Sequence, residues 1–354
     1  IKYNIHSIIS LTIENSCMLS RDQIETLLLI RKREGTILYN TRTPKPIINL
    51  ISNIGDVPNS DIATLLHHVA FGELEQVKGM LEKNPRLLLE AGNVEDPAGN
   101  TIVRVTPYEC ALGAGDDEMA GMMDEYFKKF EGGDKARLKQ YARFKTGIEQ
   151  MLDEKNAFDF GPLLQIIIES KNEDVTAALN LDFNHHSPLQ HVLEDFRKHF
   201  LPREIHRGMH FNYATLLKAF EVYDKAFDTL IKAGRSYDKC DLFWRQVIGY
   251  IQRGLPACDR QAFAQGIFYI NEKKEKLQRH FNFRFVGCSF PITSAVDSCS
   301  GLGYEYGVGH WSVAEDGRRH GALYIEAYVK QKQQTCRTYA ATSISDVSVC
   351  NFMN

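Results

Sequence analysis

Apolar residues recur at helical spacing along most of this chain. The segment 61–85 opens with Asp61, a residue type that caps helices, and runs helically to a break at Gly72. The pattern then resumes and ends at Asn84 and Pro85. The segment therefore predicts two short helices joined by a turn.

Longer helices are expected after residue 210. An apolar stripe that begins at Tyr213 continues for about five turns and ends at Gly234. A second stripe, over 244–256, ends in a Gly-Leu-Pro sequence, and a further helix is expected over 259–279. After His280 the composition changes to glycine, serine, cysteine and aromatic residues. FNFRFVGCSF and ALYIEAYV there predict short strands or ordered loops.

Four segments resemble the ankyrin pattern T-P-L-H-x-A, in which Thr caps a helix and Pro starts it. They are T-L-L-H at 64–67, T-P-Y-E-C-A at 106–111, G-P-L-L-Q-I at 161–166 and S-P-L-Q-H-V at 187–192. Their proline-equivalent positions 65, 107, 162 and 188 are 42, 55 and 26 residues apart, whereas regular arrays repeat every 33 residues or so. We therefore predict an irregular array with insertions. An unrelated helical domain is the alternative, because Ser or Thr before Pro suits any helix N-terminus.

These patterns predict a mainly α fold: an irregular ankyrin-like helical repeat array with flanking helices and a small mixed or β-containing C-terminal part. We expect residues 1–60 to form an N-terminal helical segment and a linker rich in Pro, Gly, Asn and Ser. Residues 61–200 form the repeat domain. Residues 201–354 form a C-terminal helical domain that ends in loops or short strands. Because the sequence begins with Ile1 and no signal-peptide pattern follows, we expect it to be part of a longer protein.

Charge and composition exclude two classes of partner. Lys plus Arg total 42 and Asp plus Glu total 45, so the net charge of −3 provides no strong field for nucleic acid. The longest apolar runs, such as LLQIII at 163–168, are far shorter than the roughly 18 residues of a transmembrane helix. The basic runs at 31–33 and 273–280 are interpreted as solvated helix faces rather than as contacts with a membrane surface.

Six of the twelve histidines lie between residues 185 and 210. His206 and His210 are four residues apart, so on a helix both imidazoles would lie on one face at the separation of metal ligands. Pro202 and Gly208 weaken the helix assumption, and no H-E-x-x-H sequence is present. Surface and capping histidines are the alternative interpretation. We therefore predict no metal and no other cofactor, with His206 and His210 as the candidates to examine.

The cysteines are a further group of candidates for chemistry. A nucleophilic cysteine needs a low thiol pKa and a nearby base. The combinations considered are Cys258 beside Asp259, or Cys288 and Cys299 near Asp297, with His280, His310 or His320 as the base. None lies in a recognisable signature, and buried apolar thiols are the alternative. The eight cysteines include no C-x-x-C pair, which favours reduced thiols. The catalytic residues, if any, stay unidentified.

A glycine-rich segment, SGLGYEYGVG at 300–309, has some likeness to a phosphate-binding loop. Such a loop needs a strand before it and a helix after it. The flanking sequences SAVDSCS and WSVAEDGRRHG predict neither. We interpret the segment as turns with aromatic anchors.

The run from LLHHVAFGELEQVKGMLEKNP through TPYECALGAGDDEMAGMM, between residues 65 and 123, resembles the ankyrin-type segment of Legionellales effectors. These proteins are injected into host cells by the Dot/Icm type IV secretion apparatus. HFNYATLLKAFEVY at 210–223, FWRQVIGYIQRGLPA at 243–257 and SGLGYEYGV at 300–308 are similar to the same family. The resemblance covers about residues 61–310. It is interrupted at 113–116, where Gly and Ala replace the aromatic residues expected there, and it fades after residue 310.

The resemblance implies secretion by a bacterium into the host cytoplasm, without implying one activity. Repeat arrays present extended surfaces whose side chains vary without disturbing the core. We therefore expect a protein–protein interaction module that acts on a host protein. The alternative is an effector enzyme that modifies a host protein, with its active site in 201–354 or at the interface with the repeats.

Overall fold

The computed structural model describes residues 61–234, 237–279, 299–301 and 321–350. Contacts between Cα atoms divide the chain into a unit of residues 1–64 and a unit of residues 65–354. The helices expected in 1–34, the linker at 41–60 and most of the segment 280–320 lie outside the described residues.

The first helix pair has the bounds that the sequence predicts. Helix α4 spans Asp61–Ala70, helix α5 spans Leu74–Lys83, and a 3-10 turn follows over Pro85–Leu89. The turn between the helices contains Gly72, whose φ of +72° favours glycine. Thr64 lies inside α4 rather than in the capping position that the repeat pattern gives it.

In the sequence, two strands of a small sheet lie between the first helix pair and the second. Strands β1 (Gly92–Glu95) and β2 (Thr101–Val105) form an antiparallel hairpin, and the two-residue strand β3 (Glu204–Ile205) pairs with β2 in parallel. The hairpin turn is closed by Asp96, whose carboxylate accepts the backbone N–H groups of Ala98 and Asn100. The structure therefore contains a small sheet, but it lies within and just after the predicted repeats rather than at the C-terminus.

The second helix pair follows the best match to the repeat pattern. Thr106 caps helix α6 (Pro107–Gly113) and forms a capping box with Glu109. Helix α7 (Asp117–Phe127) packs on α5, and helix α8 (Gly133–Glu149) packs on both α6 and α7.

The third helix pair consists of α9 (Gly161–Glu169) and α10 (Asn172–Leu179), as the sequence predicts. The fourth match gives a single helix, α11 (Pro188–Lys198), which is capped by Ser187 and packs on both α9 and α10. Three helix pairs are thus present. Whether they form a true ankyrin-like stack stays a prediction.

The two apolar stripes after residue 210 are helical, as predicted. Helix α12 spans Tyr213–Ala233. The second stripe forms a π-helical turn at Trp244–Ile248 and α14 (Gly249–Gln252), which follow directly on helix α13 (Asp238–Phe243). Helix α13 packs on α9, α10 and α12, so the predicted repeat and C-terminal segments share one core.

The prediction of a single helix over 259–279 is wrong. The structure has two short helices, α15 (Ala257–Gln265) and α16 (Ile267–Asn271), separated by Gly266 with a φ of +105°. Residues 274–279 are not helical, so the interpretation of the basic run as a helix face is also wrong. Burial of every residue of α15 explains the error, because a helix that is buried all round shows no amphipathic stripe.

The expectation of strands in the segment ALYIEAYV is wrong as well. That segment is the start of α17, a helix that spans Gly321–Cys350. Its buried positions follow helical spacing: Ile325, Tyr328, Val329, Lys332, Gln333 and Cys336. Two of these six residues, Lys332 and Gln333, are polar, so the buried face of the helix does not show as a continuous apolar pattern in the sequence.

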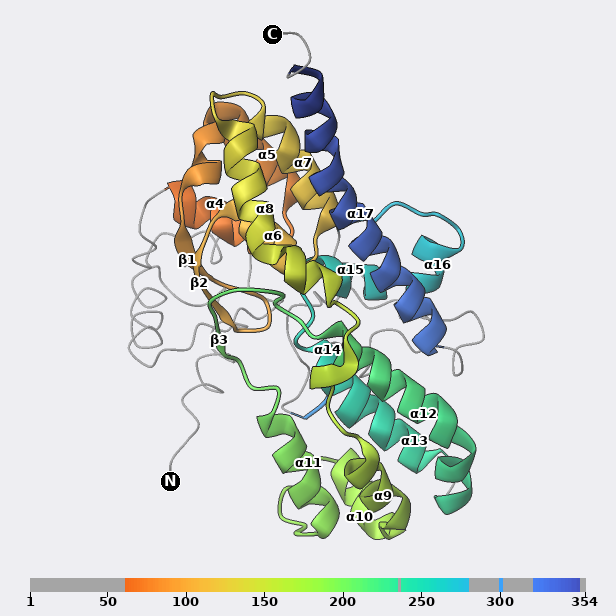
Figure 1. Ribbon diagram of the computed structural model, residues 1–354. Helices are drawn as coiled ribbons and strands as arrows, with labels where there is room; N and C mark the ends of the chain where they lie inside the picture. Colours follow the sequence, from red (N-terminus) through yellow and green to blue (C-terminus); the bar gives the residue numbers. More distant parts are fainter. Residues whose placement is uncertain (1–60, 235–236, 280–298, 302–320, 351–354) are drawn as a thin grey trace, which may run out of the picture. The chain divides into compact units, whose positions relative to one another are not determined.

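Helix α17 joins segments that are distant in sequence. It packs on α7 and α8 and also on α12 and α16 (Figure 1). The Gln333 amide donates to the carbonyl groups of Ile148 and Glu149 at the end of α8. The described residues form a mainly helical fold, and none of their helices has the length and apolarity to cross a membrane.

Candidate functional site

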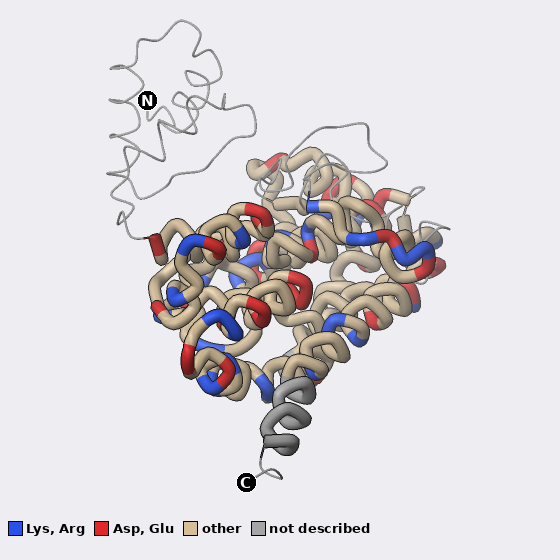
Figure 2. Tube along the Cα trace, turned by 90° about the horizontal axis from the view of Figure 1, so that it is seen from above, with Lys and Arg blue, Asp and Glu red and all other residues tan. Residues whose placement is uncertain are grey.

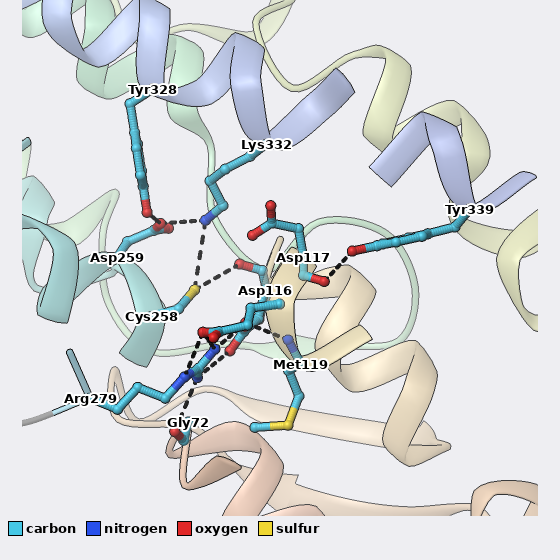
Figure 3. Close-up of polar contacts among 12 residues, drawn as sticks. Gly72, Asp116, Asp117, Met119, Cys258, Asp259, Arg279, Tyr328, Lys332 and Tyr339 are labelled. Atoms are coloured by element: carbon cyan, nitrogen blue, oxygen red, sulfur yellow. Dashed lines mark hydrogen bonds and ion pairs between the residues drawn. The ribbon is translucent and has the colours of Figure 1, made fainter. Parts of the chain in front are cut away.

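A cluster of polar side chains is enclosed between α12, α15 and α17 (Figure 3). Its centre is Asp259, which is fully buried and accepts hydrogen bonds from Tyr213 at 2.7 Å and from Tyr328 at 2.8 Å. Lys332 forms an ion pair with Asp259 and lies 3.6 Å from the thiol of Cys258. We call these five residues the buried polar cluster.

Burial and charge set the protonation states in this cluster. Burial by itself would lower the pKa of Lys332, but the charge of Asp259 raises it well above its ordinary value. Burial and then Asp259 raise the pKa of Tyr213 and Tyr328. At neutral pH, lysine is therefore charged and both phenols are protonated, so each donates to the central carboxylate.

A second ion pair lies beside the cluster. Asp116, at the start of α7, accepts a bidentate pair of hydrogen bonds from Arg279, at 2.7 and 2.8 Å. Arg279 also donates to the carbonyl oxygen of Gly72, at 3.0 Å, and to Glu118. Burial by itself would raise the pKa of Asp116, but the charge and hydrogen bonds of Arg279 lower it. One arginine thus joins the turns of the first two helix pairs.

These groups are placed to hold segments together rather than to react. Asp259 is bound by three donors, and Cys258 and Lys332 are buried. Burial and the charge of Asp259 raise the pKa of the Cys258 thiol well above its ordinary value. A protonated, enclosed thiol is a poor nucleophile. The Cys258–Asp259 pair that the sequence singled out therefore belongs to the protein core.

The structure separates the two histidines proposed as metal candidates. Neither lies on a helix. His206 is exposed and lies 3.6 Å from Glu204, whereas His210 is buried against Gly113. Burial and then the charge of Arg203 lower the pKa of His210 to about 3. Among the described residues, no group of three or more His, Cys, Asp or Glu side chains is arranged to hold a metal ion.

The remaining sequence candidates lie between residues 280 and 320. Cys288, Asp297, His280, His310 and His320, together with most of the glycine-rich segment 300–309, lie outside the described residues. Cys299 is described and buried. It lies apart from the buried polar cluster, beside α10 and α11.

The histidine-rich region contains an ordered loop that exposes an aromatic side chain. Residues 180–187, which we call the tip loop, connect α10 to α11. Phe183 in this loop is 57% exposed. The side-chain carboxylate of Asp182 accepts a hydrogen bond from the backbone N–H of Asn184. The backbone carbonyl oxygen of Asp182 accepts hydrogen bonds from the N–H of His185 and from the side-chain amide of Gln190. The loop is thus held by its own hydrogen bonds while Phe183 points into solvent.

A shallow depression lies beside Phe183, between α10 and α11. Its apolar wall is formed by Ala178, Leu181 and Leu193, and Glu194 and Arg197 lie on its polar side. Its volume of about 10 Å³ is about what one water molecule needs. This depression is too small to enclose a metabolite, but it offers an uneven surface to a macromolecule.

Charges of both signs are mixed on the face of the described residues that Figure 2 shows. Figure 2 shows Lys and Arg interspersed with Asp and Glu over the described surface in that view.

Comparisons with protein-family models, with curated proteins and with solved structures give no match to this chain.

Proposed function

We propose that this chain is a protein-binding module that a bacterium delivers into the host cytoplasm, and that it contacts a host protein through the tip loop. The observation that carries the proposal is the exposure of Phe183 on a loop that is already ordered. Aromatic side chains often dominate the energy of protein interfaces. An ordered loop also avoids part of the entropy cost of binding.

Two further observations support binding over catalysis. Two groups of 201–354 that could react, the Cys258 thiol and the Lys332 amine, are buried and in contact with each other within the core. By contrast, the tip loop exposes Phe183, and α10 and α11 on either side of it carry exposed polar side chains. The resemblance to injected effectors supports a host protein as the partner and the host cytoplasm as its location.

The test uses the complete chain, because fragments cut at residue 200 would separate α9 and α10 from α13, on which they pack. The chain and its Phe183→Ala variant would be immobilised and incubated with host-cell lysate, and the recovered proteins would be quantified. Leu323→Ala is the matched control, since Leu323 is 63% exposed on α17.

We expect Phe183→Ala to reduce the recovery of a specific set of host proteins by about tenfold or more, because central aromatic contacts contribute about 2 kcal/mol or more. Leu323→Ala should leave that set unchanged. Equal recovery by the wild type and Phe183→Ala would refute the proposed role of the tip loop.

A further inference from the structure

We infer that the side chains of Asp174 and His185 form a strut that positions Phe183 for its partner, and that they determine binding without contacting the partner. This inference depends on the proposed function of the tip loop. The Nε2 atom of His185 lies 2.6 Å from the Oδ1 atom of Asp174. The pair therefore links the end of the tip loop to the first turn of α10.

The backbone of the tip loop needs such support. Leu181 has a φ of +56°, in the left-handed region that residues other than glycine, asparagine and aspartate rarely adopt. A strained conformation persists only where surrounding contacts determine it. At the start of the loop these contacts are backbone hydrogen bonds from Leu181 to Ala178 and from Asp182 to Ala177.

Two side-chain contacts also hold the loop, one on each side of Phe183. Gln190, from α11, donates to the carbonyl oxygen of Asp182 at 2.6 Å. His185 donates to Asp174, from α10. Phe183 lies between these attachments in the sequence. Loss of the His185 contact would leave the stretch from Asn184 to Ser187 without its side-chain link to α10.

The burial of the pair is suited to a strut. The side chain of His185 is 34% exposed and that of Asp174 is 20% exposed, so water competes only in part for their hydrogen bond. His186 provides a close control, because it is the next residue in the same loop and its side chain is exposed. If the loop needed only a histidine side chain and not the contact with Asp174, His185→Ala and His186→Ala would change the loop equally.

The effect on binding follows from the cost of ordering the loop. A loop or side chain that is free before binding must be immobilised in the complex, and this loss of conformational entropy weakens binding. We therefore expect His185→Ala to reduce the recovery of the Phe183-dependent host proteins by about three- to tenfold. His185→Gln retains a donor and should restore part of the recovery, whereas a change in bulk packing would not be rescued in this way.

The experiment compares the full chain with His185→Ala, Asp174→Ala, the double variant, His185→Gln and His186→Ala. The first readout is amide hydrogen exchange of residues 180–187 in the free protein. The second is recovery of Phe183-dependent proteins from host-cell lysate, and the melting temperature checks that the global fold is retained. We expect both single variants to raise exchange in the loop about tenfold, with no further rise in the double variant.

Unchanged loop exchange in His185→Ala would overturn the strut, whatever happens to binding. Faster exchange with unchanged recovery of Phe183-dependent proteins would overturn its role in binding. If Phe183→Ala itself leaves recovery unchanged, the proposed function fails, and with it the role of the pair in binding. Loop exchange then still tests the strut by itself.

Discussion

The imidazole of His210 occupies the space that a side chain at Gly113 would need. A Cβ atom built on Gly113 would lie 2.3 Å from the Nε2 atom of His210. The backbone N–H of His210 also donates to the carbonyl oxygen of Gly113, at 2.8 Å. The second helix pair and the segment before α12 therefore meet at a contact that only glycine permits.

Gly113→Ala should lower the free energy of unfolding by about 1–3 kcal/mol, because the buried imidazole has no room to move aside. Combining it with His210→Ala should remove most of the additional cost. Chemical denaturation would measure both. The control is Gly79→Ala in α5, where a Cβ meets nothing within 4 Å and stability should rise by up to about 1 kcal/mol. Equal effects at the two glycines would contradict the contact.

The contribution of His210 to stability should depend on pH. Its folded-state pKa of about 3 is below the ordinary value of 6.5, so the unfolded chain takes up a proton first as the pH falls. The stability associated with neutral His210 is present above pH 6.5 and is lost progressively towards pH 3.

The free-energy cost of His210→Gln should therefore shrink by about 1.4 kcal/mol per pH unit between pH 6 and pH 4. Comparing wild type and variant at each pH cancels the other titrating groups. A cost of His210→Gln that is independent of pH would be inconsistent with a buried neutral imidazole.

Asp116→Asn should destabilise the fold by about 3–5 kcal/mol, because it removes a buried carboxylate and leaves the guanidinium of Arg279, which is only 14% exposed, without its main charged partner. Glu118→Gln, at the half-exposed partner of the same arginine, should cost no more than about 1 kcal/mol. Urea denaturation of both variants measures the difference. If the two substitutions cost the same, Arg279 does not join the helix pairs through Asp116.

The Cys258 thiol should resist alkylation in the native protein, since it is buried and its pKa is raised by burial and by Asp259. Labelling with iodoacetamide followed by peptide mass spectrometry would report this residue separately from the others. Modification should require denaturant. Rapid labelling of Cys258 in the folded chain would restore it as a candidate nucleophile and would favour the enzyme alternative.

The sequence by itself determined those helices that are marked by an apolar stripe or by a capping residue. Apolar spacing predicted α4, α5 and α12, and the Thr106 cap predicted the start of α6, because caps and amphipathic stripes reflect short-range geometry. The mainly helical class followed from the same patterns. The density of histidines also marked the region of the tip loop, although it did not indicate that Phe183 is the exposed residue.

Only the tertiary structure decided which polar residues lie inside. Lys332 and Gln333 occupy buried positions of α17, and every residue of α15 is enclosed, so neither helix shows a continuous apolar stripe. Lys332 pairs with Asp259, about 70 residues away in the sequence, and Gln333 binds the end of α8, about 180 residues away. A charged residue is stable in a core only when its partner is brought to it, and that pairing depends on how distant segments pack.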